Sequence, residues 1–255
     1  MSEIMLQAEN LGKRFGGIVA TDDLTLTVAA GELHAVIGPN GAGKTTLIAQ
    51  LSGQLTPDSG RIRFDGRDIT ALPMHKRSTL GLARSFQITS LFLDLSVLDN
   101  VALAVQAHAG HSFRFWRDAR LDKDLREPAR AALTRVGLGD RADWQAAALS
   151  HGEHRQLELA MALAGNPRML LLDEPMAGLG PEESARMVEL LRGLKSELTI
   201  LLVEHDMEAV FALASRITVL VYGRVIASGT PDDIRANAQV REAYLGETGE
   251  GAQNG

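Results

Sequence analysis

The fold is decided by the stretch Gly38-Pro39-Asn40-Gly41-Ala42-Gly43-Lys44-Thr45. It has the spacing G-x-x-x-x-G-K-T, in which the glycines let backbone N–H groups approach a chain of phosphates. The apolar run Leu33 to Ile37 precedes it, and the run Thr46 to Leu51 that follows reads as a helix. Because the N-terminus of a helix carries positive partial charge, this strand, turn and helix predict a site for a nucleoside triphosphate.

Each residue of this loop is a candidate for nucleotide binding. Lys44 can reach the β and γ phosphates, and the Thr45 hydroxyl can bind Mg²⁺. The alternative is a glycine-rich turn without a ligand, and the strand and helix on either side argue against it. The expected nucleotide-binding set is Gly38, Pro39, Asn40, Gly41, Ala42, Gly43, Lys44, Thr45 and Thr46.

Length and composition restrict the class of protein. The chain has 255 residues, 45% of them apolar, which supports one large domain or a domain with a lobe. Its formal charge of −6 argues against a nucleic-acid partner, and the absence of cysteine excludes disulfides and thiolate metal sites. We expect no signal peptide, because Glu3 and Glu9 replace a cationic start. No apolar run approaches the roughly 20 residues of a membrane helix.

The hydrophobic pattern changes along the chain. Residues 4–9 and 24–28 alternate apolar and polar side chains, and Asp65-Gly66 predicts a hairpin turn, so the first part reads as antiparallel strands. From about 96 to 165 the apolar residues recur every three or four positions, as in helices. Strands and helices then alternate. The expected elements are strands Met169–Asp173 and Thr199–Val203, helices Pro181–Lys195 and Met207–Ala214, and a last hairpin about Tyr222-Gly223.

These patterns predict an α/β fold of one domain. We expect a P-loop core with an antiparallel β flank, interrupted by an inserted helical subdomain. The expected single domain is 1–245, with the core and the antiparallel sheet at 1–95 and 166–245 and the helical lobe at about 96–165. The tail 246–255 is rich in Gly, Glu, Gln and Asn, and we expect it to be flexible.

Two carboxylates follow the apolar run Met169 to Leu172. A buried strand that ends in acidic residues places them at the edge where parallel sheets bind ligands. Asp173 would hold Mg²⁺, directly or through water, and Glu174 would take a proton from the attacking water. The alternative, two solvated acids at a strand end, loses weight once the phosphate-binding loop is taken into account.

The segment Leu149-Ser150-His151-Gly152-Glu153 opens a helix. Ser150 is a natural N-cap and Glu153 lies three residues on, which is the spacing of a capping box. A well-capped helix explains this pattern without any ligand. A second anion site, made of N–H groups and the serine hydroxyl, explains it equally well from the residues alone.

The order of these motifs resembles that of the ATP-binding cassette (ABC) ATPases, over about residues 3–245. The resemblance rests on Gly38–Thr46, Gln87, Leu149–Glu153, Met169–Glu174 and His205. It implies an ATP hydrolase of the ABC transporter type, with ATP and Mg²⁺ as its cofactors. It also implies a second ABC ATPase subunit as partner, either a sister chain or a second copy of this one.

The resemblance assigns further roles residue by residue. Phe15 matches the aromatic residue that stacks on adenine, and Gln87 matches the loop glutamine that senses Mg²⁺ and the partner. His205 matches the switch histidine that contacts the γ-phosphate, and it joins Glu174 and Lys44 as the catalytic candidates. Alone, Phe15 reads as a core residue, Gln87 carries no signal, and His205 reads as a packed or solvated histidine.

The resemblance also makes Ser150, Gly152 and Glu153 cofactor-binding residues, because this signature motif faces the ATP of a second subunit. The expected metal ligands are Thr45, Gln87 and Asp173. Two positions depart from the family pattern. His151 replaces the first glycine of the signature, and Gly180 stands where many relatives have Asp, which puts the cross-subunit contact of that Asp in doubt. A metal site at His151 and His154 is disfavoured, because no third ligand accompanies them.

Within the family, the chain looks most like the longer ATPase of bacterial branched-chain amino-acid importers. That likeness rests on Lys13–Gly17, Ala83–Gln87, Glu174–Leu179, the ending Gly229 to Gly246, and a helical stretch from about Ala107 to Glu127. It implies transmembrane permease subunits as partners and a peripheral place at the cytoplasmic face of the bacterial inner membrane. The alternatives are the ATPase of a urea importer or a lipid exporter, and a soluble ABC ATPase without a transport role.

The loop after Gln87 suggests where a permease docks. Residues Ile88 to Leu95 are largely apolar and connect a sheet strand to the helical lobe. Connections usually run over the surface, and an apolar surface loop suggests a partner. The alternative is that Leu91 and Phe92 pack the lobe onto the core.

Overall fold

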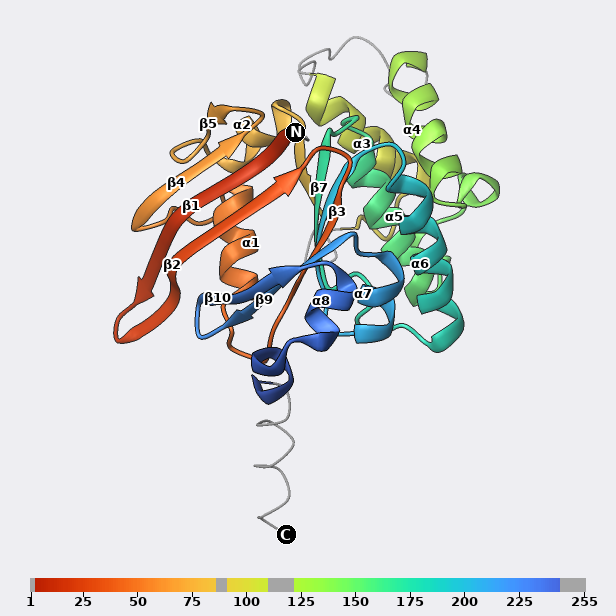
Figure 1. Ribbon diagram of the computed structural model, residues 1–255. Coiled ribbons are helices and arrows are strands. Elements are labelled where there is room, and N and C mark those ends of the chain that lie inside the picture. The colour runs from red at the N-terminus through yellow and green to blue at the C-terminus, as the bar shows by residue number, and fades with distance from the viewer. Residues whose placement is uncertain (1–2, 86–90, 110–121, 244–255) are drawn as a thin grey trace.

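The computed structural model describes residues 3–85, 91–109 and 122–243, arranged around two β-sheets (Figure 1). The first sheet is antiparallel, with the order β2-β1-β4-β5. Its turn between β4 and β5 is Asp65-Gly66, with φ of 50° and 73°, as a two-residue hairpin requires. The strands of this sheet are β1 (Ile4–Phe15), β2 (Ile18–Ala29), β4 (Ser59–Phe64) and β5 (Arg67–Asp68).

The second sheet is parallel except at one edge. Its order is β10-β9-β3-β8-β7-β6, and β10 runs antiparallel to β9. The turn between β9 and β10 is Tyr222-Gly223, again with positive φ at both residues. The strands are β3 (Leu33–Ile37), β6 (Leu82–Arg84), β7 (Met169–Asp173), β8 (Thr199–Val203), β9 (Arg216–Val221) and β10 (Arg224–Gly229).

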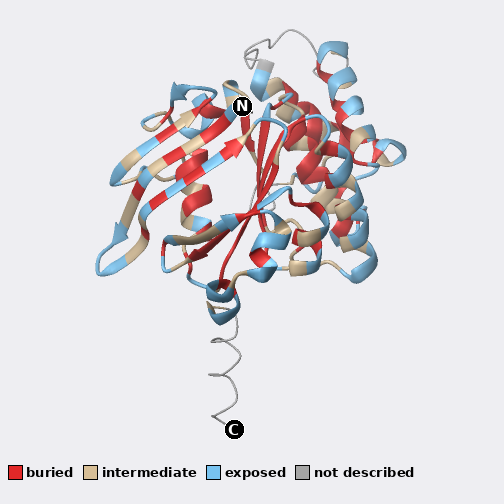
Figure 2. Cartoon of the chain, in the orientation of Figure 1, coloured by how far each residue is buried: buried red, intermediate tan, exposed pale blue. Residues whose placement is uncertain are grey.

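Alternate residues of the central strands enter different hydrophobic cores. Leu170 and Leu172 of β7 pack among the helices on one face, whereas Leu171 packs toward the antiparallel sheet on the other. Every residue of β3, β7 and β8 is buried, which Figure 2 shows as the red centre of the molecule. Burial on both faces explains why these strands are continuous apolar runs.

Helices cover both faces of the parallel sheet. Helix α1 (Lys44–Ser52) lies between the two sheets, and the helical lobe with α6 lies on the opposite side (Figure 1). The lobe helices are α3 (Val97–Ala109), α4 (Lys123–Arg135) and α5 (His151–Leu163), with 3-10 turns η2 (Gly139–Arg141) and η3 (Ala146–Ala148). The others are α2 (Met74–Thr79), α6 (Pro181–Leu194), α7 (Met207–Leu213) and α8 (Pro231–Ala236).

The expected fold class is confirmed: a P-loop α/β core carries an antiparallel sheet and a helical insert. The expected strands Met169–Asp173 and Thr199–Val203 have their observed bounds, and β1 and β2 are longer than their alternating patterns indicated. The domain limits stay a prediction. The tail 246–255 and most of the stretch from Ala107 to Glu127 lie outside the described residues. Among the helices described, none combines the length and the apolar character needed to cross a membrane.

Candidate nucleotide-binding site

Three loops leave the same edge of the parallel sheet. Strands β3, β8 and β7 are neighbours, with Val36 beside Val203 and Val203 beside Asp173 in register. Their carboxyl ends therefore deliver the phosphate loop after Ile37, the two acids at the end of β7 and the histidine segment after β8 to one place. In open α/β sheets, ligands bind at such carboxyl ends.

The phosphate loop is fixed by close backbone packing. A Cβ on Gly38 would lie 2.1 Å from the Leu220 carbonyl oxygen, and one on Gly43 would lie 2.2 Å from that of Ala20. Both glycines also have positive φ, 155° and 101°. The Gly223 N–H donates to the Ala42 carbonyl at 2.9 Å, which ties the loop to the β9–β10 turn. Only glycine satisfies both the backbone angles and the space at these positions.

The loop presents donors to its interior. Helix α1 begins at Lys44 with Gly43 as its N-cap, and no side chain of the described part caps it. The start of a helix carries positive partial charge and suits an anion. By contrast, Ser150 caps α5 and Asp206 caps α7. The Lys44 ammonium donates to the carbonyls of Gly38 at 2.5 Å and Pro39 at 3.0 Å, folded back over the loop.

Asp173 ends β7 with a buried carboxylate. Its Oδ2 lies 3.0 Å from Nη2 of Arg84, at the end of the neighbouring strand β6. Burial raises the pKa of Asp173, and the charges of Arg84 and Lys44 partly oppose that rise. Sequence reasoning did not single out Arg84 as a site residue, although the parallel strand order would place its end beside that of Asp173.

The donor set suits Mg²⁺ rather than a transition metal. Within the described residues, no group of three or more His, Asp or Glu could hold a cation alone. Mg²⁺ keeps few protein ligands and takes the rest from phosphates and water. The Asp173 carboxylate at the strand end, with the Thr45 hydroxyl at the exposed start of α1, fits that pattern. Gln87 lies outside the described residues.

Glu174 has a left-handed backbone, with φ of +49°. Its N–H donates to the Val203 carbonyl at 2.9 Å, and its side chain is 42% exposed. His205 Nδ1 lies 3.8 Å from Glu174 Oε1, and the imidazole is 63% exposed. Non-glycine residues with such φ are uncommon and concentrate at functional sites. Glu174 and His205, two of the catalytic candidates, thus lie close together and face solvent at the carboxyl edge of the sheet.

Glu204, which precedes His205, was missed by sequence reasoning. It is a fully buried carboxylate, whereas its neighbour His205 is exposed. The only signal in the sequence is an acidic residue directly after the apolar strand β8, the same pattern that marked Asp173.

The signature segment is built as a capping box. The Glu153 N–H donates to Ser150 Oγ at 3.2 Å, and the Ser150 N–H donates to Glu153 Oε2 at 2.8 Å. The Gly152 N–H donates to Glu183 Oε1 at 3.2 Å, at the start of α6. Among the described residues, these N–H groups make no hydrogen bond to the phosphate loop of their own chain.

The two departures from the family pattern lie close to this segment. A Cβ on Gly178 would lie 3.2 Å from His151 Nε2, so the imidazole covers the loop before α6. A Cβ on Gly180 would meet open space, so an Asp would fit there without a clash. His154 Nε2 lies 2.8 Å from the Ala146 carbonyl oxygen, and this contact occupies one of the two ring nitrogens through which a histidine can bind a metal.

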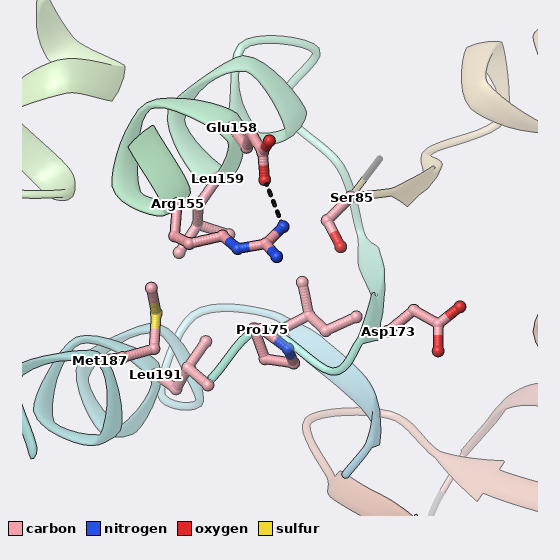
Figure 3. A pocket seen from close by; sticks show the side chains of 9 residues that line it. Ser85, Arg155, Glu158, Leu159, Asp173, Pro175, Met187 and Leu191 are labelled. Atoms are coloured by element: carbon pink, nitrogen blue, oxygen red, sulfur yellow. Dashed lines mark hydrogen bonds and ion pairs between the residues drawn. The ribbon is translucent and has the colours of Figure 1, made fainter. Parts of the chain in front are cut away.

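A small cavity separates α5 from the sheet edge (Figure 3). The ion pair of Arg155 Nη1 and Glu158 Oε2, 3.1 Å long, lies on its α5 side, with Pro175 facing it. The Asp173 carboxylate points away from the Arg155–Glu158 ion pair in Figure 3. The cavity therefore lies behind the candidate site, between the helical lobe and the core.

Phe15 and the loop before α3 are both at the surface. Phe15 ends β1 with 49% of its surface exposed, and the Lys13 ammonium lies 5.8 Å from its ring centroid. Leu91 packs against the core, whereas Phe92 is 56% exposed and its backbone is held by buried Asn100. Residues 86–90 lie outside the described residues, so the structure describes only residues 91–95 of the stretch Ile88 to Leu95. The expectation that a permease docks there stays a prediction.

Comparison with known proteins places these features in one family. The family profile described as ABC transporter matches residues 21–177. A second profile, described as branched-chain amino acid ATP-binding cassette transporter, matches residues 224–250. The structure also resembles that of an ATP-binding cassette of an ABC transporter in its ADP conformation, with a TM-score of 0.85, 29% identity, and coverage of 95% of this chain and 99% of that one.

Full-length relatives show the same similarity. The high-affinity branched-chain amino acid transport ATP-binding protein BraF of Pseudomonas aeruginosa is 39% identical, over 97% of this chain and 100% of its own. LivG of Escherichia coli K12, described in the same words, is 38% identical over the same shares. The lipopolysaccharide export system ATP-binding protein LptB of Acidithiobacillus ferridurans is 37% identical, over 97% of this chain and 98% of its own.

A test of the phosphate loop follows from its glycine packing. Gly43→Ala should weaken ATP binding by roughly 10-fold or more, because a Cβ must displace the Ala20 carbonyl and accept a left-handed φ. Gly31→Ala is the matched control, since Gly31 also has positive φ but meets open space. Titration with a fluorescent nucleotide checks both variants. Equal affinities of the two variants would contradict the packing argument.

Proposed function

This chain belongs to the ABC transporter ATPases, and from that premise we propose that it powers a bacterial importer of branched-chain amino acids. The observation that carries the cargo assignment is the match of residues 224–250 to the profile of that transporter class. BraF and LivG, whose alignments cover 97% of this chain, support the same cargo assignment. The near-equal identity of LptB keeps a lipid exporter as the second candidate.

The phosphate loop is the proposed binding site for ATP. The uncapped N-terminus of α1 and the loop N–H groups would receive the phosphates, and Lys44 would exchange its loop carbonyls for phosphate oxygens. Phe15, exposed at the end of β1, would stack on the adenine. Asp173 and Thr45, with Gln87, would hold Mg²⁺, which when bound neutralises charge on the β and γ phosphates.

Glu174 is the proposed general base. Its half-exposed carboxylate stands beyond Asp173 at the sheet edge, where a water could lie between it and a γ-phosphate. His205, 3.8 Å from this carboxylate, would contact the same phosphate from the neighbouring strand. A positioned base of this kind contributes about 10²–10⁴-fold to the rate.

Exchange of the carboxylate for an amide tests this role. Glu174→Gln should leave ATP binding nearly intact and lower turnover by about 10²-fold or more, whereas Lys44→Ala should weaken binding itself. In cells whose own copy carries Glu174→Gln, uptake of labelled leucine should fall and uptake of urea should not. Wild-type turnover of Glu174→Gln would refute the base, and unchanged leucine uptake would refute the cargo.

We also propose that hydrolysis requires two cassettes paired head to tail. The Ser150 segment offers N–H groups and a hydroxyl to an anion, yet its hydrogen bonds among the described residues go to Glu153 and Glu183 and not to the phosphate loop of its own chain. A second chain would bring its nucleotide to this segment. A dimeric ATP-binding cassette bound to ADP and phosphate, 25% identical over 89% of this chain with a TM-score of 0.75, supports such pairing.

Mixing two inactive variants tests the pairing. A Lys44→Ala chain and a Ser150→Arg chain should each be inactive, and their mixture should partly recover activity. In a mixed pair, one of the two sites combines an intact phosphate loop with an intact Ser150 segment. ATPase assays at several mixing ratios measure this recovery. Absence of recovery, with mixed pairs shown to form by cross-linking, would count against a shared site.

The permease partner is proposed to bind the surface of Phe92, Leu93 and Trp144. These side chains are 56%, 47% and 45% exposed. Two backbone hydrogen bonds hold their segments together, from Val97 to the Trp144 carbonyl and from Ala147 to the Leu93 carbonyl. Exposed apolar side chains held on an ordered backbone suit a partner. Docking there would hold the chain at the cytoplasmic face of the membrane and link each turnover to the permease.

A polar substitution at this surface separates docking from packing. Phe92→Ser should leave the melting temperature and ATP affinity of the isolated chain close to those of the wild type, while transport in membranes falls. Ile4→Ser, which changes another exposed apolar residue, 45% exposed on β1, should not affect transport. A large drop in the melting temperature of the isolated Phe92→Ser chain would show that Phe92 belongs to the core.

A further inference from the structure

Among the described residues, Glu204 stands out as a fully buried acid whose carboxylate is held by backbone N–H groups. It follows β8 and is 0% exposed, between the buried strand and the exposed His205. Its nearest cationic candidate, His205 Nδ1, lies 3.6 Å away, beyond hydrogen-bond distance. Burial of a carboxylate is costly unless hydrogen bonds replace its water, so its partners reveal its role.

Those partners are backbone N–H groups from two different loops. Glu204 Oε1 accepts from the Met176 N–H at 3.0 Å, in the turn that follows Glu174. Glu204 Oε2 accepts from the N–H groups of His205 at 2.9 Å and Asp206 at 3.4 Å. One carboxylate therefore bridges the loop of the candidate base to the loop of the candidate switch histidine. Hydrogen bonds to a charged acceptor are stronger than neutral ones.

The turn that carries Glu174 depends on this bridge. The first residue of this turn is Glu174, which has left-handed φ. Its N–H donates to the Val203 carbonyl. The Ala177 N–H closes the turn on the Glu174 carbonyl at 3.1 Å. The Met176 N–H lies between these two contacts and is satisfied by Glu204 from a neighbouring strand. A strained conformation of this kind persists only when its surroundings determine it fully.

We propose that Glu204 is a positioning residue that fixes Glu174 and His205 relative to each other. The inference rests on the proposed function, because it assigns a role within the same site. Glu204 touches neither substrate nor metal in this scheme; it acts through the Met176 N–H on one side and the His205 N–H on the other. The carboxylate makes the two loops one unit, so a movement of either is passed to the other.

The bridge requires both carboxylate oxygens. A glutamine of the same size has one acceptor oxygen, and its NH₂ group would face a backbone N–H in place of the second. Glu204→Gln therefore separates one loop from the other while the packing volume is kept. Misplacement of a catalytic group by about 1 Å costs on the order of 10²-fold in rate. The effect is expected in turnover, because the hydrogen bonds of the Glu204 carboxylate among the described residues go to the loops of Glu174 and His205 and not to the phosphate loop.

The experiment compares Glu204→Gln with Glu32→Gln in the full-length protein. Glu32 lies at the opposite end of the same sheet and accepts from the Ala29 N–H at 3.0 Å and His34 Nδ1 at 2.7 Å. Glu204→Gln should lower turnover at saturating ATP by on the order of 10–10²-fold and leave nucleotide affinity within about 3-fold. Glu32→Gln should leave turnover within about 2-fold, since the described hydrogen bonds of its side chain reach Ala29 and His34 and neither of these loops.

Hydrogen exchange separates positioning from general loosening. In Glu204→Gln, amides of 174–179 and 205–210 should exchange faster, while those of 33–52 keep the wild-type rate. Wild-type turnover in Glu204→Gln would overturn the proposal. Faster exchange that also includes residues 33–52 would overturn it too, because the role of Glu204 would then be structural only. Failure of the proposed function has a different signature, an inactive wild-type protein.

Discussion

The candidate site depends on the close packing of the phosphate loop against the backbone of two other segments. Gly38 leaves no room for a Cβ beside the Leu220 carbonyl, and Gly43 leaves none beside that of Ala20. The Gly223 N–H donates to Ala42, and the Gly223 carbonyl accepts from Asp22, both at 2.9 Å. The phosphate loop therefore packs against both sheets, on Ala20 of β2 and on Leu220 and Gly223 at the end of β9. Its shape is set before any ligand arrives, and a preformed donor nest lowers the cost of binding.

The rest of the site follows from strand order. Because β3, β8 and β7 are adjacent and parallel, their carboxyl ends bring three loops together that are far apart in sequence. Asp173 stays buried against Arg84, while Glu174, one residue later, is turned outward by its left-handed φ. Two consecutive acids thereby have different environments. That difference suits one to hold a cation and the other to meet water.

Local patterns predicted most of the fold, whereas contacts set by the fold escaped them. The strands Met169–Asp173 and Thr199–Val203 were recognisable because burial on both faces requires uninterrupted apolar residues. The cap at Ser150 was recognisable because Glu153 lies three residues on. Arg84 gave no such signal, and Glu204 gave only that of an acid directly after an apolar strand. Their partners, Asp173 and the Met176 N–H, lie 89 and 28 residues away, and only the strand order brings them near.

The hydrogen bond between the Gly152 N–H and Glu183 gives the isolated chain an internal substitute for a ligand. The signature donor is already satisfied by a carboxylate of its own chain, 3.2 Å away. On the proposed pairing, a phosphate from the second chain would replace one anion by another at the same donor. Such an exchange changes the number of hydrogen bonds little, so its free energy is small compared with that of forming a bond anew. On that pairing, the bound and released states would differ little in free energy at this donor, because it is satisfied by an anion in both.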